Sequence, residues 1–350
     1  MVTKRLFGTL SDGTKVSIWR LESKSGAYAD ISEFGGVIVK LCVPDRNGQL
    51  TDVVLGYDDL DSYLVNSNYF GAIVGRNGNR IKGACFEIDG VKYLLSSNEG
   101  SNNHHSGPNG FEKKLWNASV VSDDENSLKL FRVSVDGENG FPGKFDVSVT
   151  YGLTDNDELV ITYDALCDKK TIANMTNHSY FNLAGEGSGC VFDHELCINA
   201  DEYTPVGNDC VPTGIYEKVN GTPMDFTIPH KIGEMSGADY QQLKITNGYD
   251  HNYVVRGYSK GKMTEAAVVW SDKTGIQMKV VSDCPCVQFY AANFVNNEHG
   301  KNGHVYNARE AFCLETQFEP NAVNTKAFHS PIIDAGEKYH SRTIYAFSIK

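Results

Sequence analysis

The sequence is poor in the features that mark membrane proteins, secreted proteins and nucleic-acid-binding proteins. No apolar run is long enough to span a bilayer, and residues 1–7 lead into Gly8 without an apolar signal segment. The 350 residues carry a formal net charge of −12, which is the wrong sign for nucleic acid or anionic membrane surfaces. We therefore expect a cytoplasmic protein that binds neither nucleic acid nor membrane.

Two common metal-binding patterns are also missing. The chain contains neither His-x-His nor His-Glu-x-x-His, and the adjacent His104 and His105 would face opposite sides of a strand. The pair Cys284 and Cys286 has no second pair at zinc-ribbon spacing. The nine cysteines, an odd number, are typical of scattered buried thiols in a reducing compartment. We predict no metal site.

Helical periodicity is scarce as well. Only residues 58–64 and 235–243 resemble short helices, whereas alternation of apolar and polar residues dominates. This alternation is clearest in residues 145–151, 159–165 and 276–280. Many short strands without intervening helices predict an all-β fold, a large antiparallel sandwich or barrel. No linker-like segment divides the chain, so we expect a single domain over residues 1–350.

What the sequence does contain is polar chemistry inside apolar runs. In an extended strand, the run 177–183 would place His178, Tyr180 and Asn182 on one face. An imidazole, a phenol and an amide side by side suit a pocket that holds a small polar molecule and offers it a proton. Glu315 lies inside the apolar run 312–317, where a carboxylate needs a partner or a function.

Four further segments place amide, imidazole, guanidinium or carboxylate groups beside aromatic rings. They are residues 69–81, 102–111, 247–253 and 287–290. Taken singly, these residues have structural explanations: Arg76 or Arg80 as a surface ion-pair partner, and Asp250 as the residue that closes an Asx-turn. Gln288 could satisfy backbone groups of a strand. Together they favour a sugar site, because sugars need planar polar groups and flat apolar faces.

The motifs resemble those of the aldose 1-epimerase (galactose mutarotase) family from about Phe7 to the C-terminus. Six matching stretches follow in order: 43–48, 52–57, 69–81, 176–183, 247–252 and 313–317. The resemblance implies a galactose-mutarotase-like β-supersandwich without a cofactor. It also implies a small aldose, galactose or glucose, as the binding partner of a monomer or homodimer.

Residue by residue, the resemblance implies His178 as general acid and Glu315 as general base of an isomerase that interconverts α and β anomers. The residues that match positions holding sugar hydroxyls are Asn79, Arg80, His105, Asp250 and Gln288, and Tyr180 borders the same site. One departure is residues 104–107, His-His-Ser-Gly, where the family usually has Leu-His-Gly-Gly. His104 therefore takes the place of a leucine.

Three other functions stay open on the sequence alone. A glycoside hydrolase would use two carboxylates, and Asp250 and Glu315 are available. A non-catalytic carbohydrate-binding module would keep the aromatic residues and Arg80, but would not need His178 opposite Glu315. A hexose-6-phosphate epimerase shares the sandwich but would need a basic cluster for the phosphate, and the acidic chain shows none.

Overall fold

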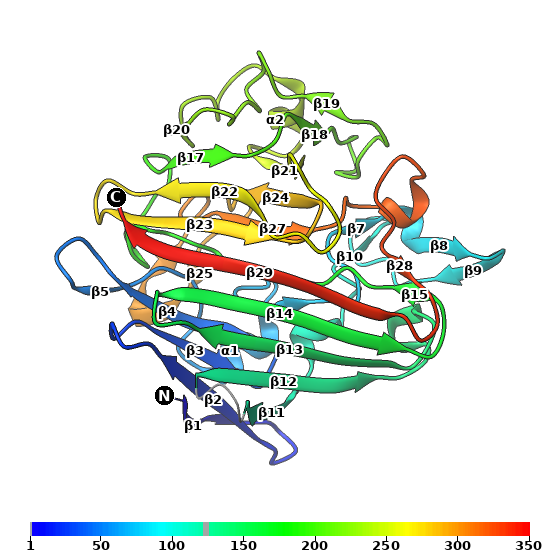
Figure 1. Cartoon of the computed structure of the whole chain (residues 1–350), viewed down its shortest axis with the longest axis horizontal. Coiled ribbons are helices and arrows are strands. Elements are labelled where there is room, and N and C mark those ends of the chain that lie inside the picture. The colour runs from blue at the N-terminus through cyan, green and yellow to red at the C-terminus, as the bar shows by residue number, and fades with distance from the viewer. Residues whose placement is uncertain (1, 122–125) are drawn as a thin grey trace.

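Strands dominate the computed structural model, which describes residues 2–121 and 126–350 (Figure 1). In this part of the chain there are 29 strands, two short α-helices and five 3₁₀ turns, which confirms the all-β prediction. None of the helices among the described residues is long and apolar enough to cross a membrane.

A nine-stranded antiparallel sheet forms the largest layer, and its long strands lie side by side across the front of Figure 1. In spatial order it comprises β11 (Asn117–Val120), β12 (Ser127–Ser134), β13 (Phe145–Leu153), β14 (Glu158–Cys167), β29 (Lys338–Ile349), β23 (Ile276–Ser282), β22 (Thr264–Trp270), β17 (Glu195–Ile198) and β20 (His230–Lys231). The predicted strands 145–151, 159–165 and 276–280 fall within β13, β14 and β23, so these predictions are confirmed.

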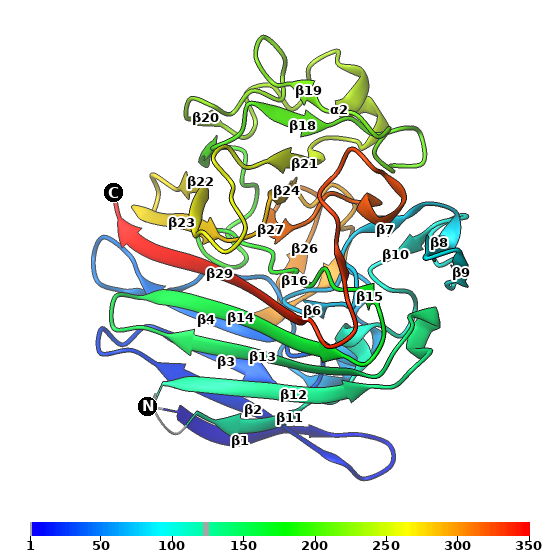
Figure 2. The ribbon, with the colours of Figure 1, turned by 45° about the vertical axis from the view of Figure 1, so that its right-hand side comes forward.

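An N-terminal sheet of five strands packs behind this layer, as Figure 2 shows. It consists of β1 (Val2–Thr9), β2 (Lys15–Glu22), β3 (Tyr28–Ser32), β4 (Ile38–Pro44) and β5 (Leu50–Asp52). Leu21 and Ile31 of this sheet share one buried core with Leu130 and Val149 of the nine-stranded sheet. Facing apolar surfaces of two sheets therefore make the sandwich.

A second five-stranded sheet, which we call the site sheet, contains β19 (Glu217–Lys218), β18 (Glu202–Thr204), β21 (Asp250–Val254), β24 (Cys286–Tyr290) and β27 (Cys313–Gln317). All residues of β24 and β27 are buried. Tyr253, Phe289 and Leu314 point from one face into the main core. The opposite face carries polar side chains, because alternate residues of a strand point to opposite sides.

The two helices only partly follow the prediction. Helix α1 (Leu60–Val65) overlaps the predicted 58–64, and the Asp59 carboxylate caps it by accepting from the Ser62 amide. Helix α2 (Gln241–Ile245) begins late in the predicted 235–243, and the preceding residues form turns and bends. Gly233 and Gly237 favour turns there over a longer helix.

All nine cysteines are free thiols, but only five of them are buried and Cys190 is exposed, so the prediction of buried thiols is confirmed only in part. The run 177–183 is less regular than predicted. Strand β16 (Thr176–Asn177) ends before His178, and single bridges from Phe181 to Val54 and Phe312 hold the rest of the run.

Candidate active site

The polar face of the site sheet brings chemistry from three strands into two rows. Antiparallel register places Asn252, Gln288 and Glu315 directly opposite one another across β21, β24 and β27. The adjacent row holds Asp250, Tyr290 and Cys313. Residues so far apart in the chain become neighbours because directly opposed residues on antiparallel strands lie close together.

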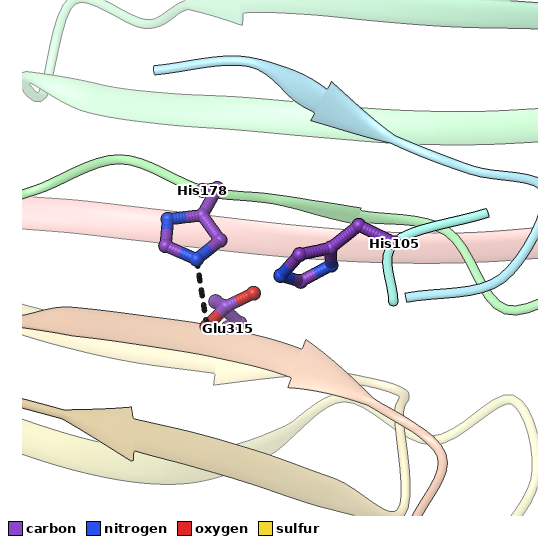
Figure 3. A group of neighbouring side chains, drawn as sticks. All are labelled: His105, His178 and Glu315. Atoms are coloured by element: carbon purple, nitrogen blue, oxygen red, sulfur yellow. Dashed lines mark ion pairs between the residues drawn. The ribbon is translucent and has the colours of Figure 1, made fainter. Parts of the chain in front are cut away.

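His178 faces this sheet from the segment after β16. Its Nε2 lies 3.6 Å from Glu315 Oε1, and both side chains are buried (Figure 3). The His178 backbone is fixed on both sides, because its amide donates to the Ala72 carbonyl and its carbonyl accepts from the Gly71 amide. Gly71 has φ +68°, and a Cβ there would lie 2.3 Å from the Ile38 oxygen, so only glycine fits.

The residues on either side of His178 form hydrogen bonds that hold the local backbone in place. The Asn177 side-chain amide donates to the Gly71 carbonyl, and its oxygen accepts from both the amide and the hydroxyl of Ser179. These bonds fix the backbone of the segment around the imidazole. Asn182, predicted on the same face as His178, instead donates to the carbonyls of Gly189 and Glu310 and holds two loops together.

His105 enters from a third element, just after β10 (Asn103–His104), and its ring points toward Glu315 (Figure 3). Its ring centroid lies 5.2 Å from that of His178. His105 Nδ1 accepts from the Asn79 amide at 3.1 Å, and the His105 amide donates to the Asn79 carbonyl. Because Nδ1 accepts a hydrogen bond, neutral His105 carries its proton on Nε2.

A cavity of about 890 Å³ opens over these groups. Seven of the eight predicted site residues line it: Asn79, Arg80, His105, His178, Tyr180, Asp250 and Glu315. The eighth, Gln288, does not line the cavity; it is buried beside Asp250, to whose Oδ1 its amide donates at 2.6 Å. In this structure Gln288 supports a cavity residue, although the sequence placed it among the residues that hold sugar hydroxyls.

Burial drives both His178 and Glu315 toward their neutral forms. Loss of solvent lowers the pKa of His178 to about 4. Burial raises the pKa of Glu315 well above its usual range, and the nearby Asp250 charge raises it further, against an opposing effect of Arg80. Because burial disfavours the charged form of each group, the two facing groups can exchange one proton across a short gap.

Arg80 is held by a carboxylate that the sequence did not single out. Its Nε and Nη2 donate to the two Glu99 oxygens at 2.6 and 2.7 Å, and its Nη1 lies 3.8 Å from Asp250 Oδ2. Burial alone would lower the pKa of Arg80, but the Glu99 bonds and the Asp250 charge raise it above its usual value. The only sequence signal for Glu99 is its position in a turn shortly before His104.

Arg76, for which a surface ion pair was the simpler prediction, is buried and has a structural role. Its guanidinium donates to Ser134 Oγ and to the carbonyls of Ser134, Val135, Pro142 and Gly143. It ties the end of β12 to the two ends of the loop that leads into β13. The surface prediction for Arg76 is wrong because carbonyl oxygens that satisfy a buried guanidinium cannot be read from a sequence.

The two residues that depart from the family pattern, His104 and Ser106, have different roles in the structure. The His104 ring lines the cavity and packs on His105 at 3.8 Å between centroids. Burial, aided by the Arg80 charge, lowers the pKa of His104 well below its usual range, so it is neutral. Ser106 is fully buried, where it accepts from the Asn77 amide and donates to the Asn77 carbonyl.

His105, His178 and Glu315 form the one group in the described part of the chain whose ligand atoms are close enough to suggest a metal ion, within 4.8 Å of one another. A metal ligand must present a lone pair. His105 Nε2 carries a proton because Nδ1 accepts from Asn79, so this ring does not fit a metal in the centre. The geometry suits proton transfer instead.

Comparisons with known proteins agree with this geometry. The family model described as aldose 1-epimerase matches residues 17–346. The chain is 42% identical to galactose mutarotase of Sus scrofa, over 99% of both chains, and 34% identical to aldose 1-epimerase of Escherichia coli K12, over 96% of both. The crystal structure of an aldose epimerase homologue from C. elegans superimposes with a TM-score of 0.87 at 30% identity, covering 95% of this chain and 99% of that one.

Proposed function

The chain belongs to the aldose 1-epimerase family, and on this premise we propose that it is an isomerase that interconverts the α and β anomers of D-galactose and D-glucose. The observation that carries the proposal is the 3.6 Å approach of His178 Nε2 to Glu315 Oε1 inside the cavity.

This short separation matches the chemistry of a cyclic sugar hemiacetal. Ring opening removes a proton from the C1 hydroxyl and adds one to the ring oxygen, and both oxygens are bonded to C1. The acid and the base must therefore lie close together. Glu315 takes the hydroxyl proton while His178 Nε2 protonates the ring oxygen and the C1–O5 bond breaks. The aldehyde then rotates about C1–C2, and the same groups close the ring on its other face.

The proton shared by the pair makes the cycle reversible. After ring opening, Glu315 is protonated and His178 is neutral; ring closure returns the proton to the imidazole. Burial disfavours the charged pair and so favours the arrangement in which Glu315 holds the proton, which is the one reached on ring opening. Each positioned proton transfer contributes about 10²–10⁴-fold in rate.

The remaining cavity groups suit the sugar itself. Asp250 and Arg80 offer an acceptor and a donor, Asn79 an amide, and His105 an Nε2–H, all of which pair with hydroxyls. Tyr180 provides a flat ring for the C–H side of the pyranose.

The cations at the cavity argue against a sugar phosphate. Arg80 is paired with Glu99 and Asp250, and Lys113 Nζ donates to the carbonyls of Tyr63, Leu64 and Asn66. Neither is a free charge for a phosphate. A hydrolase is disfavoured because the closest acid–base pair is an imidazole and a carboxylate, and the second carboxylate, Asp250, is engaged by Gln288.

Polarimetry of freshly dissolved α-D-galactose tests the proposal. The protein should speed the approach to the equilibrium rotation, and α-D-glucose should show the same effect. Parallel incubations with a chromogenic galactoside and with galactose 6-phosphate should show no release of the chromophore and no acceleration. Release of the chromophore without faster mutarotation would contradict the proposal.

We also propose that the chain acts as one domain in the cytoplasm, as a monomer or homodimer. Nine free thiols suit a reducing compartment. Light scattering at several protein concentrations would distinguish the two oligomeric states.

A further inference from the structure

The catalytic imidazole has a second neighbour on the same strand as its carboxylate. Cys313 precedes Glu315 by two residues on β27, so both side chains point to the same face of the site sheet. Cys313 Sγ lies 3.6 Å from His178 Nδ1, and Glu315 Oε1 lies 3.6 Å from Nε2. One strand therefore contacts both nitrogens of one ring.

The position of the proton that Glu315 and His178 exchange determines which nitrogens of His178 carry hydrogen, and therefore whether Cys313 Sγ accepts a hydrogen bond from Nδ1. When the proton is on the imidazole, both ring nitrogens carry hydrogen. When it is on Glu315 or has passed to the substrate, Nε2 must hold a lone pair, so the remaining hydrogen is on Nδ1. Nδ1 thus donates throughout the cycle, and Sγ is its acceptor.

We propose that Cys313 is a positioning residue, which keeps His178 protonated at Nδ1 and directs Nε2 toward Glu315 and the sugar. This inference rests on the proposed function. Without an acceptor at Nδ1, the neutral ring is free to place its hydrogen on Nε2, and that tautomer cannot take the proton back when the ring closes.

A thiol suits this position better than a stronger acceptor. Burial raises the pKa of Cys313 well above its usual range, so the sulfur is uncharged. A neutral sulfur is a weak acceptor that orients the ring but stabilises the imidazolium little. A carboxylate in its place would stabilise the imidazolium by its charge and weaken His178 as an acid.

The other groups around the ring hold its plane without bonding to Nδ1. Four aromatic rings surround the imidazole. Their centroids lie 5.9 Å (Tyr69), 5.0 Å (Tyr180), 6.3 Å (Tyr290) and 5.2 Å (His105) from that of His178. Among the described residues, Cys313 is the side chain within hydrogen-bond distance of Nδ1. A hydrogen bond of His178 with its own backbone also favours the protonated ring, so Cys313 is the side-chain contribution to the placement of the proton.

Two substitutions at Cys313 distinguish a role as hydrogen-bond acceptor from a role in packing alone. Cys313→Val fills the site with a slightly larger apolar side chain and removes the acceptor, and should lower kcat by about tenfold with little change in KM. Cys313→Ser keeps an acceptor in a smaller side chain and should retain most of kcat. The same pair of changes at Cys42, a buried thiol on β4 that does not line the cavity, should leave both constants unchanged.

Tautomer populations give an independent readout. In protein labelled with ¹⁵N-histidine, the His178 resonances, assigned with His178→Asn, should report hydrogen on Nδ1 in wild type and Cys313→Ser. They should report loss of this preference in Cys313→Val.

A valine variant with wild-type kcat, or equal losses in both variants, would overturn the role of Cys313. Failure of the wild type itself to speed mutarotation would instead refute the proposed function, so the two failures are distinguishable.

Discussion

The nine-stranded sheet and the site sheet are built from the same kind of strand but bury different chemistry. In β13 the inward Phe145 and Val147 are apolar and buried, whereas Asp146 between them is exposed. In β27 every residue is buried, and the face turned away from the main core presents Glu315 and Gln317. Alternation in the first sheet separates core from solvent; in the second it separates core from cavity.

This difference teaches how to read a carboxylate in a strand. A charged residue that alternates outward from a one-sided sheet is solvated and needs no explanation. One in a strand buried on both faces costs free energy unless other groups compensate it. One oxygen of Glu315, Oε2, has no hydrogen-bond partner among the described residues, so it is available to a molecule that enters the cavity.

The largest expected effect is a fall in the rate of mutarotation, which substitutions in the site should cause and a substitution in the nine-stranded sheet should not. Glu315→Gln and His178→Asn should each lower kcat by about 10²–10⁴-fold, because each removes one proton transfer, while the fold stays intact. Polarimetry with circular dichroism measures both properties. Asp164→Asn, on the exposed face of β14, is the matched control and should change neither. Near-normal rates in both catalytic variants would refute the assignment.

The next largest effect is a loss of stability without a loss of activity, expected for a substitution in the nine-stranded sheet. Leu130→Ala empties a fully buried position of β12 and should lower the free energy of unfolding by about 2–5 kcal/mol. The kcat of the folded protein should remain at the wild-type value, since Leu130 does not line the cavity. Urea denaturation and polarimetry test this together; a fall in kcat would show that the large sheet also shapes the site.

Two buried arginines sharpen the comparison further. Arg80→Ala should raise KM by about 10- to 100-fold, because it removes a charged donor from the cavity. Arg76→Ala should lower the thermal midpoint and leave KM unchanged, since its guanidinium bonds only to structural groups. Substrate titrations of both variants distinguish them, and a KM effect of Arg76→Ala would contradict its structural role.

Two buried histidines provide a test by pH. Burial lowers the pKa of His194 to about 4, as it does that of His178, but His194 Nε2 only accepts from the Leu183 amide. Between about pH 6.5 and 4 the unfolded chain binds the proton that folded His194 refuses. Wild type should therefore lose stability relative to His194→Asn by about 1.4 kcal/mol per unit as pH falls through this range.

Urea unfolding of both proteins between about pH 7 and 5 measures this slope. The mutarotation rate of His194→Asn should equal that of wild type. A parallel pH dependence in the two proteins would show that His194 does not titrate as its burial requires.

The smallest effect concerns the clamp on Arg80. Glu99→Gln keeps an acceptor but removes the charge of a partly exposed ion pair, so KM should rise only about threefold. Glu99→Ala removes both oxygens and should raise it more. Steady-state mutarotation kinetics measure the series; equal KM values in all three proteins would show that Asp250 alone positions Arg80.

Much of the fold was predictable from local pattern. Strand residues 145–151 and 159–165 alternate so regularly that only one pleated arrangement buries their apolar side chains. Residues 235–243 misled because their apolar spacing resembles a helix, whereas Gly237 and its surroundings form turns. The motif around His178 was recognisable, but its strand was predicted too long, since its backbone bonds partly to a loop at Gly71 and Ala72.

The site was predictable as a set of residues but not as an arrangement. Glu99 and Cys313 act through contacts with residues 19 and 135 positions away in the chain, and no local pattern marks them. Gln288 was placed among the residues that hold sugar hydroxyls by the family resemblance, whereas in the structure its amide donates to Asp250 and it does not line the cavity.

The sequence by itself determined the strands, the acidic surface, the free thiols and the family, because each depends on composition or on neighbouring residues. Only the tertiary structure decided which groups meet. Register across β21, β24 and β27, with His178 and His105 brought in from separate loops, sets the distances and the burial. Those two quantities control where a proton resides, and neither exists until distant segments pack together and exclude water.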